Sequence, residues 1–156
     1  MRQYWLMKSE PDEVSIDDAL AAPGQTVPWT GVRNYQARNF MRDQMRVGDG
    51  VLFYHSSCPE PGIAGIAEVA SGPYPDPTQF DARSPYHDPA SKPDAPRWLL
   101  VDVRALRKTR LLGLAEMREH AALADMLVLK KGNRLSITPV DARHWRLIEK
   151  LLGGRP

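Results

Sequence analysis

The sequence has a single cysteine, Cys58, among its 156 residues. One cysteine cannot form an intramolecular disulfide, so a fold held together by disulfides is excluded. No segment approaches the roughly 18 consecutive apolar residues that a membrane-spanning helix needs. The apolar run near the N-terminus ends at Lys8, which is too early for a secretory signal peptide. From these absences we expect a cytoplasmic protein that does not enter a membrane.

Net charge is also nearly absent, because 21 Lys and Arg oppose 19 Asp and Glu. The charges are nevertheless segregated along the chain. Residues 29–48 carry four arginines and one aspartate, and residues 97–156 carry thirteen basic and six acidic side chains, whereas 1–28 and 49–96 are acidic. A basic face favours phosphate-bearing partners. The alternative is that these charges are only the solvated sides of helices and strands.

The length and the composition indicate a single globular domain over residues 1–156. A chain of this length can bury one sizeable core but is too short for two. Hydrophobic residues make up 42% and charged residues 26%, which is typical of ordinary globular proteins. We find no internal repeat, low-complexity tract or inter-domain linker.

The spacing of apolar and turn-forming residues predicts short strands with helices between them. Strands are expected over 4–7, 51–55, 63–70, 98–104 and 134–137. Helices are expected over 16–22 with Ser15 as N-cap, and over 34–45, 111–119, 121–127 and 138–152. The stretch 59–96 holds nine of the fourteen prolines, which favours a long ordered loop. Together these elements predict an α+β fold, with a small, mainly antiparallel β-barrel and peripheral helices.

The usual signatures of catalysis are missing. His55 precedes two serines and Cys58, but adjacency along an extended strand does not give the hydrogen-bond geometry of an activated nucleophile. There is no nucleophile elbow and no glycine-rich phosphate loop. A zinc site would need a second pair of ligands beside His55 and Cys58, and Asp81, His87 and Asp88 are of the types that usually form turns. We therefore expect no enzyme, no metal and no cofactor.

Aromatic residues flanked by hydrogen-bonding groups are the stronger signal. Trp29 lies in a predicted loop and is followed by Arg33, Asn34 and Arg38 at the start of a predicted helix. Tyr54 and His55 add two more ring faces at the end of a strand. Such a set can stack on a planar base, bind its edge and hold the neighbouring phosphate. The alternative for Trp29 is that its indole fills one end of the barrel core.

Ordered blocks over nearly the whole chain resemble the EVE domain. The blocks are YWLMKSEP at 4–11, WTGVRNYQARN at 29–39, VGD at 47–49, FYHS at 53–56, GIAGIAEV at 62–69, PTQFD at 77–81, PRW at 96–98, RLS at 134–136 and PV at 139–140. The resemblance implies a fold of the PUA-like superfamily, related to YTH and ASCH domains, with a small barrel flanked by helices. It also implies nucleic-acid binding, with modified bases, especially modified cytosines in DNA, as ligands.

The resemblance further implies roles for individual residues. In the related YTH pocket a Trp from the loop after the first helix walls the cage around a methylated base, and Trp29 is similar in position. Thr30 follows where a backbone carbonyl meets the exocyclic amine of the base, and Ser9 and Glu10 would line the base edge. The loop at 57–61 departs from the basic or amide-bearing sequence expected of the family, and Cys58 has no assigned role.

The leading hypothesis is a module that binds a modified base of nucleic acid, most specifically modified cytosine in DNA. Trp29 and Tyr54 would form the walls of its pocket, and Arg33 or Arg38 would hold the neighbouring phosphate. Two alternatives stay open. One is a PUA-like module that binds RNA, and the other is an enzyme acting on a nucleotide or RNA, with His55 or Glu10 as acid or base.

Overall fold

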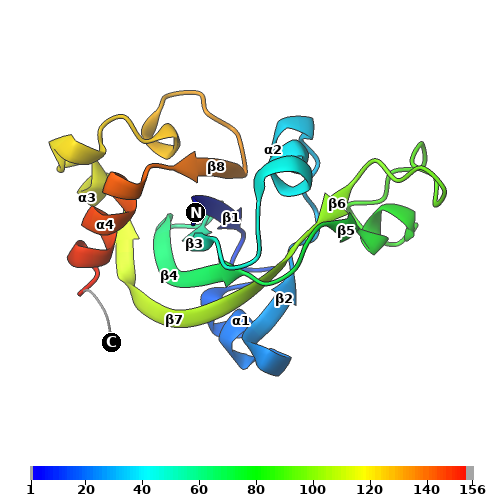
Figure 1. Cartoon of the computed structure of the whole chain (residues 1–156), viewed down its shortest axis with the longest axis horizontal. Coiled ribbons are helices and arrows are strands. Elements are labelled where there is room, and N and C mark those ends of the chain that lie inside the picture. The colour runs from blue at the N-terminus through cyan, green and yellow to red at the C-terminus, as the bar shows by residue number, and fades with distance from the viewer. Residues whose placement is uncertain (1, 154–156) are drawn as a thin grey trace.

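The computed structural model describes residues 2–153, which form a six-stranded sheet, a two-stranded sheet and several short helices (Figure 1). The strands of the large sheet are β1 Tyr4–Ser9, β2 Thr26–Pro28, β3 Gly50–His55, β4 Gly62–Val69, β7 Asp102–Gly113 and β8 Ile137–Val140; the small sheet pairs β5 Tyr74–Pro75 with β6 Leu99–Leu100. The α-helices are α1 Ile16–Ala21, α2 Tyr35–Asn39, α3 Leu114–Arg118 and α4 Ala142–Leu151. A π-helical turn, η2 Phe40–Gln44, continues α2, and the 3-10 turns are η1 Pro23–Gln25, η3 Pro77–Phe80, η4 Ala121–Leu123 and η5 Leu127–Leu129.

The large sheet has the strand order β2-β7-β4-β3-β1-β8. Its neighbours are antiparallel except β1 and β3, which run parallel. This confirms the predicted mainly antiparallel α+β architecture with peripheral helices. The sheet is strongly curved (Figure 1), but in the described residues β2 and β8 remain as its two edges. A closed barrel is therefore not confirmed.

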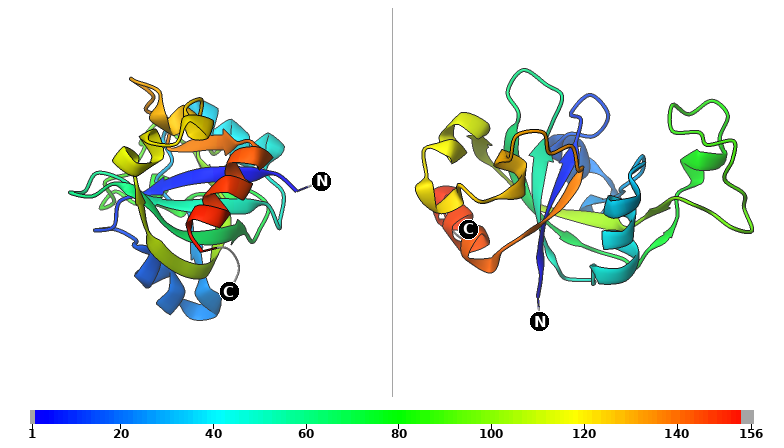
Figure 2. Two further views of the ribbon diagram at one scale, coloured as in Figure 1. Left: turned by 90° about the vertical axis from the view of Figure 1, so that its left-hand side faces the viewer. Right: turned by 90° about the horizontal axis from the view of Figure 1, so that it is seen from above.

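Each face of the sheet buries its own hydrophobic core, and β3 shows how the sequence divides them. Successive side chains of a strand point to opposite faces. Val51 and Phe53 accordingly pack in one core, beneath α1 and α2, whereas Leu52 and Tyr54 pack in the other, beneath α3 and α4. The two views of Figure 2 show these helix pairs on different sides of the sheet. Alternate side chains of β3 therefore contribute to the two cores on opposite faces of the sheet.

The two helices nearest the N-terminus begin at the predicted residues. The Ser15 hydroxyl accepts a hydrogen bond from the Asp18 amide at 3.1 Å, and the Asp18 carboxylate accepts one from the Ser15 amide at 2.9 Å, which completes a capping box. Asn34 caps α2 in the same manner through its Oδ1 and the Ala37 amide, at 3.0 Å. The helix predicted over 34–45 is regular only to Asn39 and continues as η2.

The second half of the chain corrects several predicted elements. The strand expected to end at residue 104 continues as β7 to Gly113, so helix α3 is confined to Leu114–Arg118. The helix expected over 121–127 is replaced by the short turns η4 and η5. The last strand, expected over 134–137, is β8, and it contains Pro139, which the sequence had favoured for the first turn of the closing helix. An edge strand tolerates proline because one of its sides needs no N–H donor.

The proline-rich segment between β4 and β7 is irregular but held by buried polar groups. The Gln79 amide donates to the backbone carbonyls of Asp76 and Trp98, each at 2.7 Å. Its Oε1 accepts from the Ser91 hydroxyl at 2.6 Å and from the Trp98 amide at 3.1 Å. These contacts fix the excursion that carries β5, η3 and β6 away from the large sheet at the right of Figure 1. No helix within residues 2–153 has the length and apolar character that a membrane crossing requires.

Candidate functional site

A cavity of about 370 Å³ lies where the end of β1 meets β2 and several loops. This volume falls within the range of small-molecule pockets, roughly 300–1,000 Å³. Its lining comes from the end of β1 and the loop after it, from residues 27–32, from the loop after β3, from the proline-rich segment and from the chain leading into β8. Of the residues predicted for the site, the cavity brings together Ser9, Glu10, Trp29 and Thr30.

Trp29 forms one wall of the cavity and also belongs to the core beneath α1 and α2. Its indole is only 5% exposed and meets the Phe53 ring edge-on, with centroids 5.2 Å apart. Its backbone amide donates to the Val101 carbonyl at 3.0 Å, directly beyond the end of β2. The two sequence interpretations of Trp29 are therefore compatible, because one part of the ring packs in the core and another borders the cavity.

Ser9 and Glu10 line the cavity where β1 ends. The Ser9 hydroxyl donates to the Val14 carbonyl at 2.7 Å, and the Ser9 carbonyl accepts from the Ser56 amide at 2.9 Å. The Glu10 carbonyl accepts from the amides of Glu13 and Val14, which forms the turn before α1. These bonds fix the backbone, while the Glu10 side chain stays exposed at the cavity.

Tyr86 and Glu13 complete the cavity, although sequence reasoning missed both. The Tyr86 hydroxyl donates to the Glu13 carboxylate at 2.6 Å. Burial, the bond to Glu13 and the nearby carboxylates raise the pKa of Tyr86 to about 12, so the phenol keeps its proton at neutral pH. The Tyr86 ring lies so close to Gly31 that a Cβ at Gly31 would be 2.7 Å from it. Glu13 and Tyr86 are 73 positions apart in the sequence, and no local pattern predicts their contact.

Arg33 supports the cavity wall from behind. Its guanidinium donates to the Tyr86 carbonyl at 2.7 Å, to the Thr78 hydroxyl at 3.0 Å and to the Asp76 carboxylate at 3.1 Å. Asp76 is fully buried and also accepts from the Gly31 amide at 2.8 Å. The structure thus places Arg33 in a network that ties the segment after Trp29 to the proline-rich segment, and Arg33 does not line the cavity.

Asn34 and Arg38 lie outside the cavity lining as well. Asn34 is the N-cap of α2. Arg38 donates to the Asn39 side chain at 2.8 Å and to the Arg97 carbonyl at 2.9 Å, and its guanidinium carbon lies 4.7 Å from the centroid of the Tyr35 ring. Asn34 and Arg38 therefore both form contacts within the protein, outside the cavity lining.

Tyr54, predicted as a second wall, lies on the face of the sheet opposite to Trp29. It is 3% exposed in the core beneath α3 and α4, and burial raises its pKa to about 12. His55 is engaged at α1, where its Nε2 accepts the Ile16 amide at 3.1 Å. Burial lowers the pKa of His55, which keeps the ring neutral and able to accept this bond. Neither residue lines the cavity.

The cavity lining includes charged residues of both signs. Glu10 and Glu13 are acidic, and Arg134 is a basic residue from the chain that leads into β8. Lys8 also lines the cavity, but its Nζ lies 6.0 Å from the centroid of the Tyr54 ring, which belongs to the core of the other face of the sheet. Partial burial lowers the pKa of Lys8. Carboxylates can accept hydrogen bonds from amino groups, and cationic groups can bind phosphate oxygens. A ligand that carries both an amino group and a phosphate would match these residue types.

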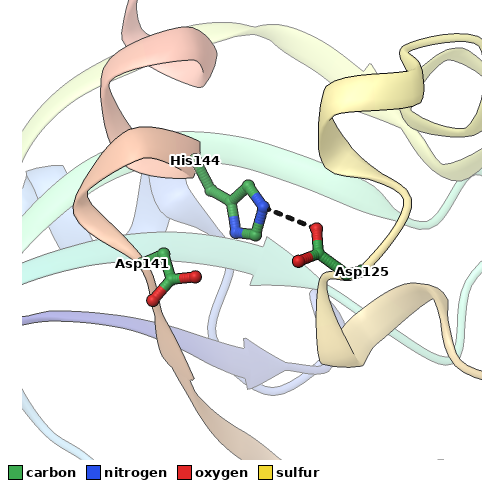
Figure 3. A group of neighbouring side chains, drawn as sticks. All are labelled: Asp125, Asp141 and His144. Carbon is green, nitrogen blue, oxygen red and sulfur yellow. Dashed lines mark hydrogen bonds and ion pairs between the residues drawn. The ribbon is translucent and has the colours of Figure 1, made fainter.

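A separate cluster of polar residues joins α4 to the segment before η5 (Figure 3). Asp125, Asp141 and His144 place one potential metal-ligand atom each within 4.8 Å of the others. His144 Nε2 bonds Asp125 at 2.9 Å, and Arg143 forms ion pairs with both aspartates. Through Asp125, which contacts both Arg143 and His144, this cluster bridges two segments of the chain.

Asp81 and Asp88, two residues of the proline-rich segment with potential metal-ligand side chains, form hydrogen bonds within the protein. The Asp88 carboxylate accepts from the Trp98 indole at 2.8 Å, and Asp81 accepts from the Arg83 amide at 3.0 Å. Aspartate side chains in turns and loops commonly accept hydrogen bonds of this kind.

The fold and the cavity together define a small α+β domain whose pocket is lined by a tryptophan and by charged residues of both signs. The chain belongs to the EVE domain family, whose family model matches residues 3–151.

Similar proteins support this assignment. Human thymocyte nuclear protein 1 is 43% identical over 97% of this chain and 74% of its own length. A crystal structure of a protein from Pseudomonas putida has a TM-score of 0.89 and 48% identity, covering 95% of this chain and 98% of that one. The structure of human THYN1 protein in complex with DNA containing 5-methylcytosine has a TM-score of 0.88 and 44% identity, covering 99% of both chains. An ASCH protein from Zymomonas mobilis shares only the fold, with 9% identity and a TM-score of 0.56.

Proposed function

We propose that this protein is a nucleic-acid-binding module that holds a modified cytosine of DNA in the cavity beside Trp29. The observation that carries the proposal is that Trp29 is among the residues that line a base-sized cavity. A base that leaves the duplex loses its stacking on the neighbouring bases. Stacking on an aromatic side chain of the protein compensates for about 1–3 kcal/mol of this loss.

The glutamates that line the cavity support cytosine as the base. Cytosine presents an amino group at N4, and Glu or Asp carboxylates accept hydrogen bonds from it. Glu10 supplies such a carboxylate at the cavity, and Ser9 and Thr30 supply further polar groups there. Thymine and uracil carry a carbonyl oxygen at the same ring position, which a carboxylate repels.

The choice of 5-methylcytosine as the modified base comes from a similar protein. The human THYN1 protein was solved with DNA containing 5-methylcytosine, and this chain is 44% identical to it over nearly its whole length. We extend that ligand to this chain because its cavity combines an aromatic wall with an acceptor for the amino group. The proposal is one of binding; His55, one of the two residues considered as acid or base, accepts the Ile16 amide and does not line the cavity.

The test is a binding titration at fixed salt with Trp29→Ala. The ligands are a DNA oligonucleotide with one 5-methylcytosine, the same DNA without the methyl group, and RNA of the same sequence. We expect Trp29→Ala to weaken binding of the methylated DNA by roughly 5- to 150-fold, the equivalent of 1–3 kcal/mol. Tyr35→Ala removes a half-exposed aromatic ring outside the cavity and should change little.

Because Trp29 is also part of the core, Glu10→Gln provides a second variant. Glu10 is exposed, so its replacement should leave the fold intact while removing the charge that faces the amino group. Equal affinity of wild type, Trp29→Ala and Glu10→Gln for the methylated DNA would exclude this cavity as the binding site. Tighter binding to RNA than to either DNA would favour the RNA-binding alternative.

A further inference from the structure

Three basic side chains stand without partners on the loop that leads into β8. Lys130, Lys131 and Arg134 are exposed, and within residues 2–153 their side chains form no hydrogen bond, ion pair or ring contact. The loop is the orange segment at the top of Figure 1, between η5 and β8. We call residues 130–134 the basic loop.

The basic residues of β7 behave differently, although they are just as exposed. Arg104 pairs with Glu68 at 3.5 Å, Lys108 with Asp17 at 3.1 Å, and Arg110 with Glu116 at 2.8 Å. Their charges are already balanced by neighbouring carboxylates. The excess of positive charge in residues 97–156 is therefore not spread evenly, and the basic loop holds a share that nothing nearby neutralises.

The backbone of the basic loop is fixed. The Asn133 amide donates to the Lys130 carbonyl at 3.2 Å, and Gly132 adopts a φ of +80°, which the turn requires. The Asn133 side chain donates to the Leu127 carbonyl at 2.6 Å and accepts from the Leu135 amide at 3.0 Å. The loop thus presents both lysines from a closed turn, and a partner would not have to order the chain.

The basic loop is continuous with the rim of the cavity. Arg134 lines the cavity, and so does Lys8, whose backbone amide donates to the Ser136 carbonyl at 2.8 Å. The turn brings Lys130 next to Asn133, the neighbour of Arg134. Arg134 therefore links the cavity lining to the turn that carries Lys130 and Lys131.

We propose that the basic loop binds consecutive phosphates of the strand whose base enters the cavity. This inference rests on the proposed function. A strand of DNA presents one phosphate every 3.4 Å or so of helix axis, and unpaired lysines and arginines bind such groups while releasing counterions. Phosphate contacts of this kind position the nucleic acid and carry no information about the base.

The experiment compares two double variants that remove the same charge. Lys130→Ala/Lys131→Ala alters the basic loop, and Arg104→Ala/Lys108→Ala removes two exposed charges from β7, away from the cavity lining. Each variant and the wild type are titrated with the methylated and the unmethylated DNA at several salt concentrations. The slope of log K against log salt falls by about 0.7 to 0.9 for each phosphate contact that is lost.

We expect the basic-loop variant to bind both DNAs about tenfold or more weakly at 0.1 M salt, with a slope lowered by about 1.4 to 1.8. The ratio between methylated and unmethylated DNA should not change, and the β7 variant should resemble the wild type. Equal slopes for the two double variants would overturn the inference. Trp29→Ala separates the two claims: if it keeps both the wild-type slope and the wild-type preference for methylated DNA, the proposed function fails while the basic loop stands.

Discussion

At Gly31 the backbone turns with a φ of +85° directly against the ring of Tyr86. A side chain here would meet both a conformational cost, about 1–2 kcal/mol for a left-handed backbone, and a ring atom 2.7 Å from its Cβ. Glycine is thus needed at Gly31 for two independent reasons. One of them concerns the cavity itself, because Tyr86 is part of its lining.

We predict that Gly31→Ala destabilises the protein by more than this conformational cost and displaces Tyr86. Gly48→Ala is the matched control, since Gly48 has a φ of +95° but no atom within 4 Å of a built Cβ. Urea denaturation of both variants would isolate the contribution of the ring contact. Equal losses of unfolding free energy in the two variants would contradict the close packing of Tyr86 on Gly31.

His55 gives a prediction about pH. Burial lowers its pKa below the ordinary 6.5, so the unfolded chain takes up a proton at a pH where the folded chain does not. The stability that His55 contributes is therefore complete above pH 6.5 or so and is lost as the pH falls below that value. Asp17 opposes this shift and Lys108 adds to it, both more weakly than burial.

The variant His55→Gln should flatten this dependence, because an amide oxygen can still accept the Ile16 amide but does not titrate in this range. The measurement is the difference in unfolding free energy between wild type and variant from about pH 7.5 to about pH 5. We expect wild type to lose stability relative to the variant over this range. A constant difference would show that His55 titrates as it does in the unfolded chain.

At the scale of elements, the proline-rich segment depends on one buried carboxylate. Asp76 is fully buried, and it receives hydrogen bonds from Gly31, Arg33 and Thr78. This set joins the segment after β2 to η3, which begins at Pro77. Loss of one partner from a buried ion pair leaves an uncompensated charge and costs about 3–5 kcal/mol.

We therefore predict that Asp76→Ala lowers the unfolding free energy by about 3 kcal/mol or more, and that DNA binding weakens because the support of Gly31 and Tyr86 is lost. Asp43→Ala serves as control, since its ion pair with Arg42 at 2.9 Å is exposed and should contribute at most about 1 kcal/mol. Denaturation curves of the two variants provide the comparison. Similar losses would mean that Asp76 does not hold the segment in place.

The elements that the sequence predicts well are those with a local signal. Ser15 and Asn34 start their helices through bonds to residues three positions away, and such spacing is visible in the sequence. The continuation of β7 to Gly113 was missed because its outer side chains are mostly charged and its pairing with β4 is distant in sequence. Pro139 was assigned to a helix because only the sheet order reveals that β8 is an edge strand.

At the scale of the whole molecule, the cavity residues that could be predicted are again those with a local sequence signal. Those that were missed depend on contacts between segments distant in the sequence. Trp29 and Glu10 could be placed at the site from motifs that are continuous in the sequence. Tyr54 was assigned to it although strand alternation turns its side chain away from Phe53, the residue that contacts Trp29. Tyr86 was missed because its contacts with the first part of the chain arise only on folding.

The structure is also needed to see which charges of the molecule are paired and which are not. The near-zero net charge conceals ion pairs on β7 and the unpaired basic loop beside the cavity. We expect discrimination between bases to come from the cavity and most of the salt-dependent affinity to come from the loop. The two contributions should therefore respond to different substitutions.

The central claim is that a methylated cytosine enters the cavity and lies against Trp29. Nuclear Overhauser contacts between the 5-methyl protons of a bound DNA oligonucleotide and the protein test it most directly. We predict contacts with the ring of Trp29 and none with Trp98 or Trp145, which do not line the cavity. Methyl contacts confined to residues outside the cavity, or a methylcytosine that stays stacked in its duplex, would contradict the account.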